Sequence, residues 1–304
     1  MQFTHKLFYI MSNNIYLKKG LDLPINGTAA QNTKKVIAPD VVAVKPTDFR
    51  GLVPKLLVRE GDKVLAGTPV LADKMSQNIL FASPVSGTVL EVVRGEKRKL
   101  LEVRIKADAN QEYVDFGVKK ASSLTAAQVK ESLLAAGLWP AITQRPYGII
   151  ADPETTPKAI FVSAFSTAPL AANVEYALNG QLDNIQAAVD ALGKIAKVHV
   201  CVNAANESAT LFGKLQNVTL HTVSGKHPAG NVGVQIHHIA PIQKGEIVWT
   251  VSPVMLAAIG KLFTTGKYDV KRKIAVTGPK AVNPAYVEGY PGISIKDLKE
   301  YYNE

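Results

Sequence analysis

The stretch "SGKHPAGNVGVQIHHI" is the part of the sequence that is most typical of a ligand-binding loop. His227 precedes a proline and lies between Gly225 and Gly230, and glycine lets a backbone approach a ligand or a partner closely. A histidine in such a loop can offer a hydrogen bond from its ring. The alternative is a turn whose histidine is bonded only within the protein, and the sequence leaves both interpretations open.

Other polar residues favour neither a metal site nor a hydrolase. His237 and His238 are adjacent, so on a strand their side chains would point to opposite faces and would make poor ligands for one metal. Ser163 and Ser166 have no G-x-S-x-G motif around them. Arg145, which precedes a proline, either faces an anionic group or anchors a surface loop.

The sequence also lacks a phosphate-binding loop. The segment "SAFSTAPLAAN", where a strand would lead into a helix, contains no glycine, although backbone amides that cradle a phosphate need glycine. Residues 260–267, "GKLFTTGK", have five rather than four residues between their glycines, and Tyr268 follows where a P-loop needs Ser or Thr. Nucleotide binding is therefore not expected at either place.

Two kinds of element must position these residues. From Ala38 to Ala107, short runs alternate apolar and polar residues between Gly, Pro and Asp, which indicates an all-β module. Its two halves resemble those of biotinyl or lipoyl carrier domains, the barrel-sandwich hybrid fold. In a carrier the modified lysine precedes the proline of the second half by about eight residues so that it lies on the hairpin tip. Here Lys74 is ten residues before Pro84, and Ser76 has the carrier position.

We therefore expect a carrier fold used as a docking surface, and keep a biotin or lipoate carrier modified on Lys74 as an alternative. After this module, β-branched runs at 158–165, 197–204 and 218–224 alternate with helical patterns, which predicts βαβ units and a Rossmann-like α/β layer. The apolar helix expected within 252–266 is predicted to lie buried against a sheet rather than in a membrane.

Composition narrows the class of protein further. The 304 residues are 47% hydrophobic and 20% charged, with a net charge of +10. No apolar run is long enough to cross a bilayer. The lysines are dispersed without interleaved aromatic residues, so no nucleic-acid partner is predicted. A single cysteine, Cys201, excludes an internal disulfide and a cysteine-ligated iron–sulfur cluster, and favours the cytoplasm.

Several ordered blocks of sequence resemble one family, the A subunit of the bacterial Na+-translocating NADH:quinone reductase. The blocks are "IYLKKGLDLPINGTAAQ", "VKPTDFRGLVPKLLVREGDKV", "SPVSGTVLEV", "GLWPAITQRP", "PKAIFVSAFSTAPLAA" and "KHPAGNVGVQIHHI". The resemblance implies kinship with the C subunit of the Rnf complex and with the flavin-binding subunit of complex I. Those relatives carry a glycine-rich flavin loop, and here the matching residues 137–142 have lost most of that glycine.

The resemblance implies a peripheral subunit on the cytoplasmic side of the bacterial inner membrane, which docks on integral membrane subunits of a sodium pump. It implies that this chain holds neither flavin nor an iron–sulfur cluster, and that partner subunits hold them. A quinone head group needs hydrogen-bond donors and a flat apolar slot, which His227 with Trp139 or Tyr147 could supply. The competing class is an independent flavin-dependent enzyme that oxidises NADH.

The expected organisation is an α+β multidomain chain. We expect a disordered leader at 1–14, then the barrel-sandwich module at 15–110 and the Rossmann-like domain at 111–269. Residues 270–304 resemble the start of a β-grasp segment of the soluble ligand-binding kind, truncated so that strand edges would remain unpaired.

Overall fold

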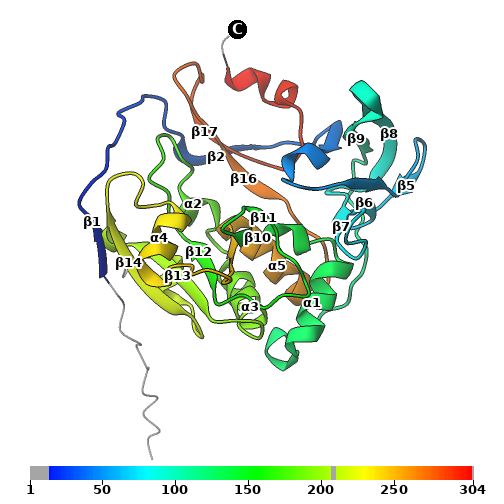
Figure 1. Cartoon of the computed structure of the whole chain (residues 1–304). Helices are drawn as coiled ribbons and strands as arrows, with labels where there is room; N and C mark the ends of the chain where they lie inside the picture. The colour runs from blue at the N-terminus through cyan, green and yellow to red at the C-terminus, as the bar shows by residue number, and fades with distance from the viewer. Residues whose placement is uncertain (1–13, 207–209, 303–304) are drawn as a thin grey trace, which may run out of the picture.

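A computed structural model describes residues 14–206 and 210–302 of the chain (Figure 1). The predicted leader lies outside these residues apart from Asn14, which begins the first strand. Three packed units make up the described chain: a seven-stranded α/β sheet, a pair of small β-sheets, and a further three-stranded sheet.

The largest unit is a mixed sheet of seven strands in the order β1-β14-β13-β12-β15-β10-β11. Its strands are β1 (Asn14–Leu17), β10 (Ile142–Arg145), β11 (Ile149–Ile150), β12 (Ile160–Ser163), β13 (Val198–Asn203), β14 (Thr219–Gly225) and β15 (Val248–Val251). The five strands from β1 to β15 in this order are parallel, and β10 and β11 continue the sheet antiparallel. The predicted βαβ units are confirmed.

Helices cover both faces of this sheet. They are α1 (Ala126–Ala135), α2 (Val174–Ala177), α3 (Leu182–Leu192), α4 (Val232–Ile239) and α5 (Pro253–Thr265). The helix α4 packs against one face with Phe161, whereas α3 and α5 pack against the other with Ile160. The helix within 252–266 is therefore a buried core helix, as predicted, and Ser252 caps it by accepting a hydrogen bond from the backbone of Met255.

Periodic apolar residues explain why α3 lies where it does. Ile185, Ala188, Val189 and Leu192 recur at helical spacing, and all four are fully buried. The helix crosses α5 at Gly260, where a Cβ atom would lie 2.9 Å from the Asn184 Cα atom and closer still to the Asn184 carbonyl group. Only glycine permits this close crossing of α3 and α5, which fixes the position of α5 on the sheet.

Two small sheets form the barrel-sandwich module that the alternation predicts. One contains β3 (Val41–Val44), β9 (Leu100–Ala107), β8 (Gly87–Arg94) and β5 (Lys63–Val64); the other contains β4 (Pro54–Leu56), β6 (Pro69–Asp73) and β7 (Leu80–Ala82). The turn between β6 and β7 closes with a hydrogen bond from the Ile79 amide to the Ser76 carbonyl. Lys74 therefore precedes the tip turn, as its spacing from Pro84 predicts.

The third unit joins both ends of the described chain. Strands β16 (Arg272–Val276) and β17 (Ala285–Gly289) pair antiparallel, and β2 (Ala30–Val36) pairs parallel to β17. A 3₁₀ helix, Ile295–Tyr301, packs its Tyr301 against them. Two strands lie within 270–304, and β2 from the other end of the described chain pairs with β17. That this segment is the start of a β-grasp unit stays a prediction.

The strands described before Val41 thus belong to two sheets other than those of the carrier-like module. Strand β1 extends the α/β sheet beside β14, and β2 completes the third sheet. Strand β2 is exposed along its whole length and pairs through its backbone, so no alternating pattern marks it. The division of the chain at 110 and 269 stays a prediction. Among the described residues, no helix is both long and apolar enough to span a membrane.

Candidate functional site

A cavity of about 1010 Å³ lies where the three units meet. The chain passes from β12 to β13 and β14 in one direction, and then returns to place β15 on the other side of β12. Such a reversal of strand order is the switch point at which open α/β sheets bind ligands, beyond the carboxyl ends of the strands. Ser163 at the end of β12 and Val251 at the end of β15 both line the cavity.

The α/β unit supplies the rim of the cavity through two helix N-termini. Asn231 and Gly233 in the first turn of α4 line it, as do Ser252 and Met255 at the start of α5. Below them, Gln235 is fully buried and donates from Nε2 to the Ser163 hydroxyl at 2.9 Å. This bond ties α4 to the end of β12 and so holds the rim in place.

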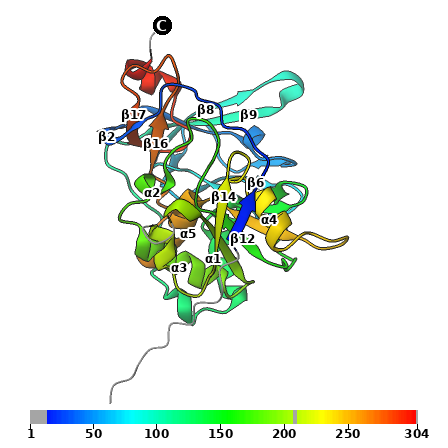
Figure 2. The same ribbon diagram turned by 90° about the vertical axis from the view of Figure 1, so that its left-hand side faces the viewer.

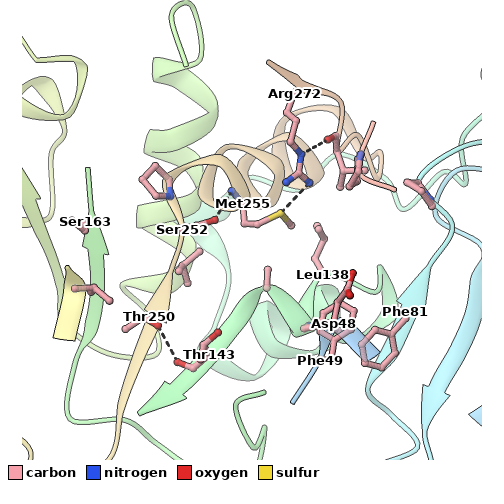
Figure 3. Close-up of a pocket in the computed structure, with 18 of the residues that line it drawn as sticks. Asp48, Phe49, Phe81, Leu138, Thr143, Ser163, Thr250, Ser252, Met255 and Arg272 are labelled. Atoms are coloured by element: carbon pink, nitrogen blue, oxygen red, sulfur yellow. Dashed lines mark hydrogen bonds between the residues drawn. The ribbon is translucent and has the colours of Figure 1, made fainter. Parts of the chain in front are cut away.

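Apolar side chains from the other units form one wall. Phe49 and Phe81 of the carrier-like module stack edge to face with ring centroids 4.7 Å apart. Figure 3 shows both rings beside Leu138, with Arg272 and Met255 across the cavity from them. An apolar wall of this kind suits an aromatic or quinone ring, because ligand pockets combine apolar walls with a few placed polar groups.

Arg272, at the start of β16, is the most distinctive polar group of the site. Its Nε donates to the Val270 carbonyl at 3.2 Å, and one Nη group approaches the Met255 sulfur at 3.5 Å. Burial lowers the pKa of Arg272 below its usual range, an effect that Tyr268 partly offsets. In the described part of the chain it forms no ion pair, so most of its N–H groups remain free for a ligand.

Other charged groups lie on the same lining. Arg145 lines the cavity, and its Nε is buried without a hydrogen-bond partner. Whether Arg145 faces an anionic group or anchors a loop stays a prediction. Lys45 and Asp48 of the carrier-like module also line the cavity. Cations therefore outnumber carboxylates around it, which favours a ligand with electron-rich oxygens.

Trp139, which the sequence offers as a quinone contact, lies in the core of the α/β unit. It is fully buried, its Nε1 donates to the Ala151 carbonyl at 2.7 Å, and its ring packs edge to face on Trp249 with centroids 5.4 Å apart. A side chain enclosed in this way is core, and it does not line the cavity, although its neighbours Leu138 and Pro140 do.

The structure does not bring His227 and Tyr147 to the cavity either. The His227 ring nitrogen Nδ1 lies 3.2 Å from the Thr167 hydroxyl, its amide donates to Asp22, and its carbonyl accepts from the Leu21 amide. Tyr147 lies between β10 and β11 with 67% of its surface exposed. His227 is thus hydrogen-bonded to two other segments of the protein, around Asp22 and Thr167.

The histidine pair differs from the strand geometry considered for it. His237 and His238 lie at the end of α4, both exposed, with ring centroids 5.3 Å apart. Across residues 14–206 and 210–302, no three His, Cys, Asp or Glu side chains are arranged to hold a metal ion.

The loop at 137–142 does not fit a flavin phosphate. The amides of Leu138 and Ala141 are bonded within the protein, the Ile142 amide donates to the Trp139 carbonyl, and Pro140 has no N–H. A phosphate cradle needs free amides that converge on one point. Residues 260–267 form the end of α5, where Gly266 is a left-handed cap and not a phosphate loop.

Sequence reasoning missed most of the lining because it comes from distant segments. Phe49 and Phe81 of the carrier-like module meet Arg272 of the third sheet only through the packing of the units. Of the segment "KHPAGNVGVQ", Gly230 and Gly233 line the cavity, whereas His227 is not among the lining residues.

The fold and cavity define a class of protein, in which a carrier-like β module without a tip lysine joins a Rossmann-like domain around a ligand-sized cavity. Two models of known protein families match the chain. Residues 15–108 match the family described as NqrA N-terminal barrel-sandwich hybrid domain, and residues 124–268 match NqrA second alpha/beta domain. The chain belongs to the NqrA family.

Curated relatives agree with this assignment. The chain is 37% identical over 287 residues to the A subunit of the Na(+)-translocating NADH-quinone reductase of Pseudomonas aeruginosa, which is 93% of this chain and 64% of that protein. It is 35% identical over 286 residues to the corresponding protein of a Marinomonas species, with 93% and 63% covered, and 37% identical over 292 residues to that of Serratia proteamaculans, with 93% and 64% covered. The chain spans slightly less than two thirds of the length of these relatives.

Proposed function

We propose that this chain works as a peripheral subunit of a Na+-translocating NADH-quinone reductase, on the cytoplasmic side of the bacterial inner membrane. It docks on integral membrane subunits, and its cavity admits the head group of a quinone. The names of the relatives support membership of this complex. The volume and the lining of the cavity support a quinone as its ligand.

The observation that carries the quinone proposal is the pairing of an apolar aromatic wall with a free guanidinium. The rings of Phe49 and Phe81 offer a surface for the flat quinone ring. The remaining N–H groups of Arg272 can donate to a quinone carbonyl oxygen, and a partly buried cation favours the negative charge that this oxygen gains when the ring is reduced. In this proposal Arg145 is a second donor at the same cavity.

We further propose that flavins and iron–sulfur clusters belong to the partner subunits. The amides of Gly137, Leu138, Ala141 and Ile142 are bonded within the protein, which leaves no converging set of free amides for a flavin phosphate. Cys201 is the single cysteine of the chain and is fully buried, whereas a cluster needs several thiolates. The role of this chain is then to dock and to shape the approach of the quinone.

Purification from the host membrane tests the docking proposal. The tagged protein is expected to recover integral membrane proteins that carry flavin absorbance, and the complex is expected to reduce quinone with NADH. Recovery as a lone chain with stoichiometric flavin that oxidises NADH unaided would refute the proposal and establish the flavoenzyme alternative. An intact-mass increase on Lys74 would instead establish the carrier alternative.

A filled cavity tests the quinone proposal. Gly233 lines the cavity at the start of α4, and a Cβ atom built on it meets nothing within 4 Å, so Gly233→Trp adds bulk there without backbone strain. We expect the KM for a short-chain quinone to rise about tenfold or more, the effect of losing roughly 1.4 kcal/mol of binding. His238→Trp, exposed on the same helix and away from the lining, is the matched control. Equal KM values for the two variants would contradict the proposal.

A further inference from the structure

The turn that joins β8 to β9 carries an unusual concentration of positive charge. Residues 94–99 contain four cationic side chains, Arg94, Lys97, Arg98 and Lys99, and one carboxylate. All four cations are exposed, and within the described part of the chain none of them forms an ion pair. Figure 2 shows the β8–β9 hairpin projecting from the body of the molecule. We call residues 94–99 the basic tip.

The backbone of the basic tip is strained. Lys97 has φ 52° and ψ 31°, and Arg98 has φ 59°, both in the left-handed region. The Lys99 amide donates to the Glu96 carbonyl at 3.1 Å, so the tip is a two-residue turn of the type I′ class. Such turns strongly prefer Asn-Gly, because a side chain at positive φ is sterically unfavourable.

Two of the four cationic residues, Lys97 and Arg98, therefore stand at positions where a side chain lowers the stability of the turn. Side chains of the tip also maintain this geometry, since Arg94 donates from Nη1 to the Arg98 carbonyl at 3.2 Å. Local strain of this kind persists at sites where it serves a function. The carboxylates farther along the hairpin, Glu91 and Glu102, are both paired with Arg104 and do not neutralise the tip.

We propose that the basic tip docks on an anionic lipid surface, with its four cations among the lipid phosphate groups. Arginine and lysine bind phosphate oxygens through charge-assisted hydrogen bonds, and basic segments are attracted to the negative cytoplasmic leaflet. A narrow projecting turn can reach into a headgroup layer without moving the rest of the fold. The choice of a lipid surface over an acidic protein rests on the proposed function, which places the chain beside a membrane.

Vesicle binding by the full chain tests this inference. We expect sedimentation with vesicles of phosphatidylcholine containing roughly one third phosphatidylglycerol, weakening as salt is added, and no sedimentation with phosphatidylcholine alone. The double variant Lys97→Asn with Arg98→Gly restores the favoured turn and removes two charges. We expect its midpoint of thermal unfolding to rise by about 2–4 °C and its affinity for the anionic vesicles to fall by roughly thirty-fold.

The opposite signs of these two effects make the test specific, because a misfolded variant would lose stability and binding together. The control variant Lys18→Gln with Lys19→Gln removes two exposed charges just after β1, which lies away from the β8–β9 hairpin in Figure 1, and its affinity is expected to change less than about threefold. Failure of the unmodified chain to bind the anionic vesicles, or equal affinity of the tip variant, would overturn the inference. If the chain still recovers flavin-bearing membrane subunits in that case, the proposed function survives and the tip binds an acidic protein or nothing.

Discussion

The close crossing of α3 and α5 at Gly260 leads to a quantitative prediction. A Cβ atom at Gly260 would lie 2.9 Å from the Asn184 Cα atom, where ordinary contacts begin at 3.4 Å, and it would lie closer still to the Asn184 carbonyl. Because these are backbone atoms, no side-chain rotation can relieve the contact. The carbonyl oxygen makes the closest contact, so in Gly260→Ala the two helices must separate by more than about 1 Å, and a gap of that size forfeits about half of each dispersion contact.

The expected cost follows from two opposing effects. Overpacking a core of this kind costs about 3 kcal/mol at the upper end of its range, whereas alanine gains about 1 kcal/mol over glycine within a helix. We therefore expect Gly260→Ala to lower the free energy of unfolding by about 2 kcal/mol. The matched control, Gly233→Ala in α4, meets nothing within 4 Å and is expected to raise it by about 0.5 kcal/mol.

Urea unfolding followed by tryptophan fluorescence measures both variants, because the two tryptophans, Trp139 and Trp249, are buried in the α/β unit. The expected difference between the two glycine substitutions is about 2.5 kcal/mol in their effect on stability. A neutral or stabilising Gly260→Ala would refute the crossing geometry, and with it the position of α5 on the cavity rim.

Three further predictions concern the buried polar groups. His199 lies with Nδ1 2.8 Å from Nε2 of His221, and burial first, then His221, lowers the pKa of His199 from 6.5 to about 4. The free energy of unfolding is therefore expected to be unaffected by His199 above pH 6.5 and to fall by roughly 1 kcal/mol per pH unit as the pH drops from 6.5 toward 4, because the unfolded chain binds the proton more readily. The profile is expected to be flatter in His199→Gln, and parallel profiles for the two proteins would contradict this. Burial raises the pKa of the Cys201 thiol to about 12, so a thiol reagent at about pH 8 is expected to react only after denaturation, and full labelling of the native chain would exclude the buried position. Trp139→Phe removes the bond to the Ala151 carbonyl and is expected to cost about 2 kcal/mol in urea unfolding, whereas a loss below about 0.5 kcal/mol would show that the indole is not a core group.

Much of the architecture could be predicted because it depends on local pattern. The helical spacing of Ile185, Ala188, Val189 and Leu192 in α3 reports burial directly. The β-branched runs at 160–163 and 198–203 are strands for the same reason, since they are buried on both faces of a parallel sheet. Wherever one face of a helix or strand is buried, its apolar residues recur in the sequence at the spacing typical of that element.

Strands that pair without a buried face could not be found in this way. Strand β2 has the polar sequence "AQNTKKV", is exposed throughout, and joins β17 from the far end of the chain by backbone bonds. Strand β1 joins β14 across about 200 residues of sequence. The residues around β1 and β2 do not indicate which strand each of them pairs with. The expected module 15–110 therefore included residues that lie in other sheets.

The candidate site was predicted only in part, for a related reason. An aromatic residue in a loop can face the core or a ligand. Trp139 faces the core, where its N–H donates to the Ala151 carbonyl and its ring packs on Trp249. The residues that do line the cavity, including Phe49, Phe81 and Arg272, come from distant segments of the chain in different sheets. Their meeting depends on how the units pack, which no local pattern records.

Photolabelling tests the central claim most directly. A quinone with a photoreactive group on its ring would be activated in the purified complex, and the labelled peptides of this chain identified by mass spectrometry. We expect label on the peptides that contain Phe49, Phe81 or Leu138, with protection by excess unmodified quinone and loss of label in Gly233→Trp. Label confined to the peptides of His227 and Tyr147, or its absence from this chain, would contradict a quinone site in the cavity.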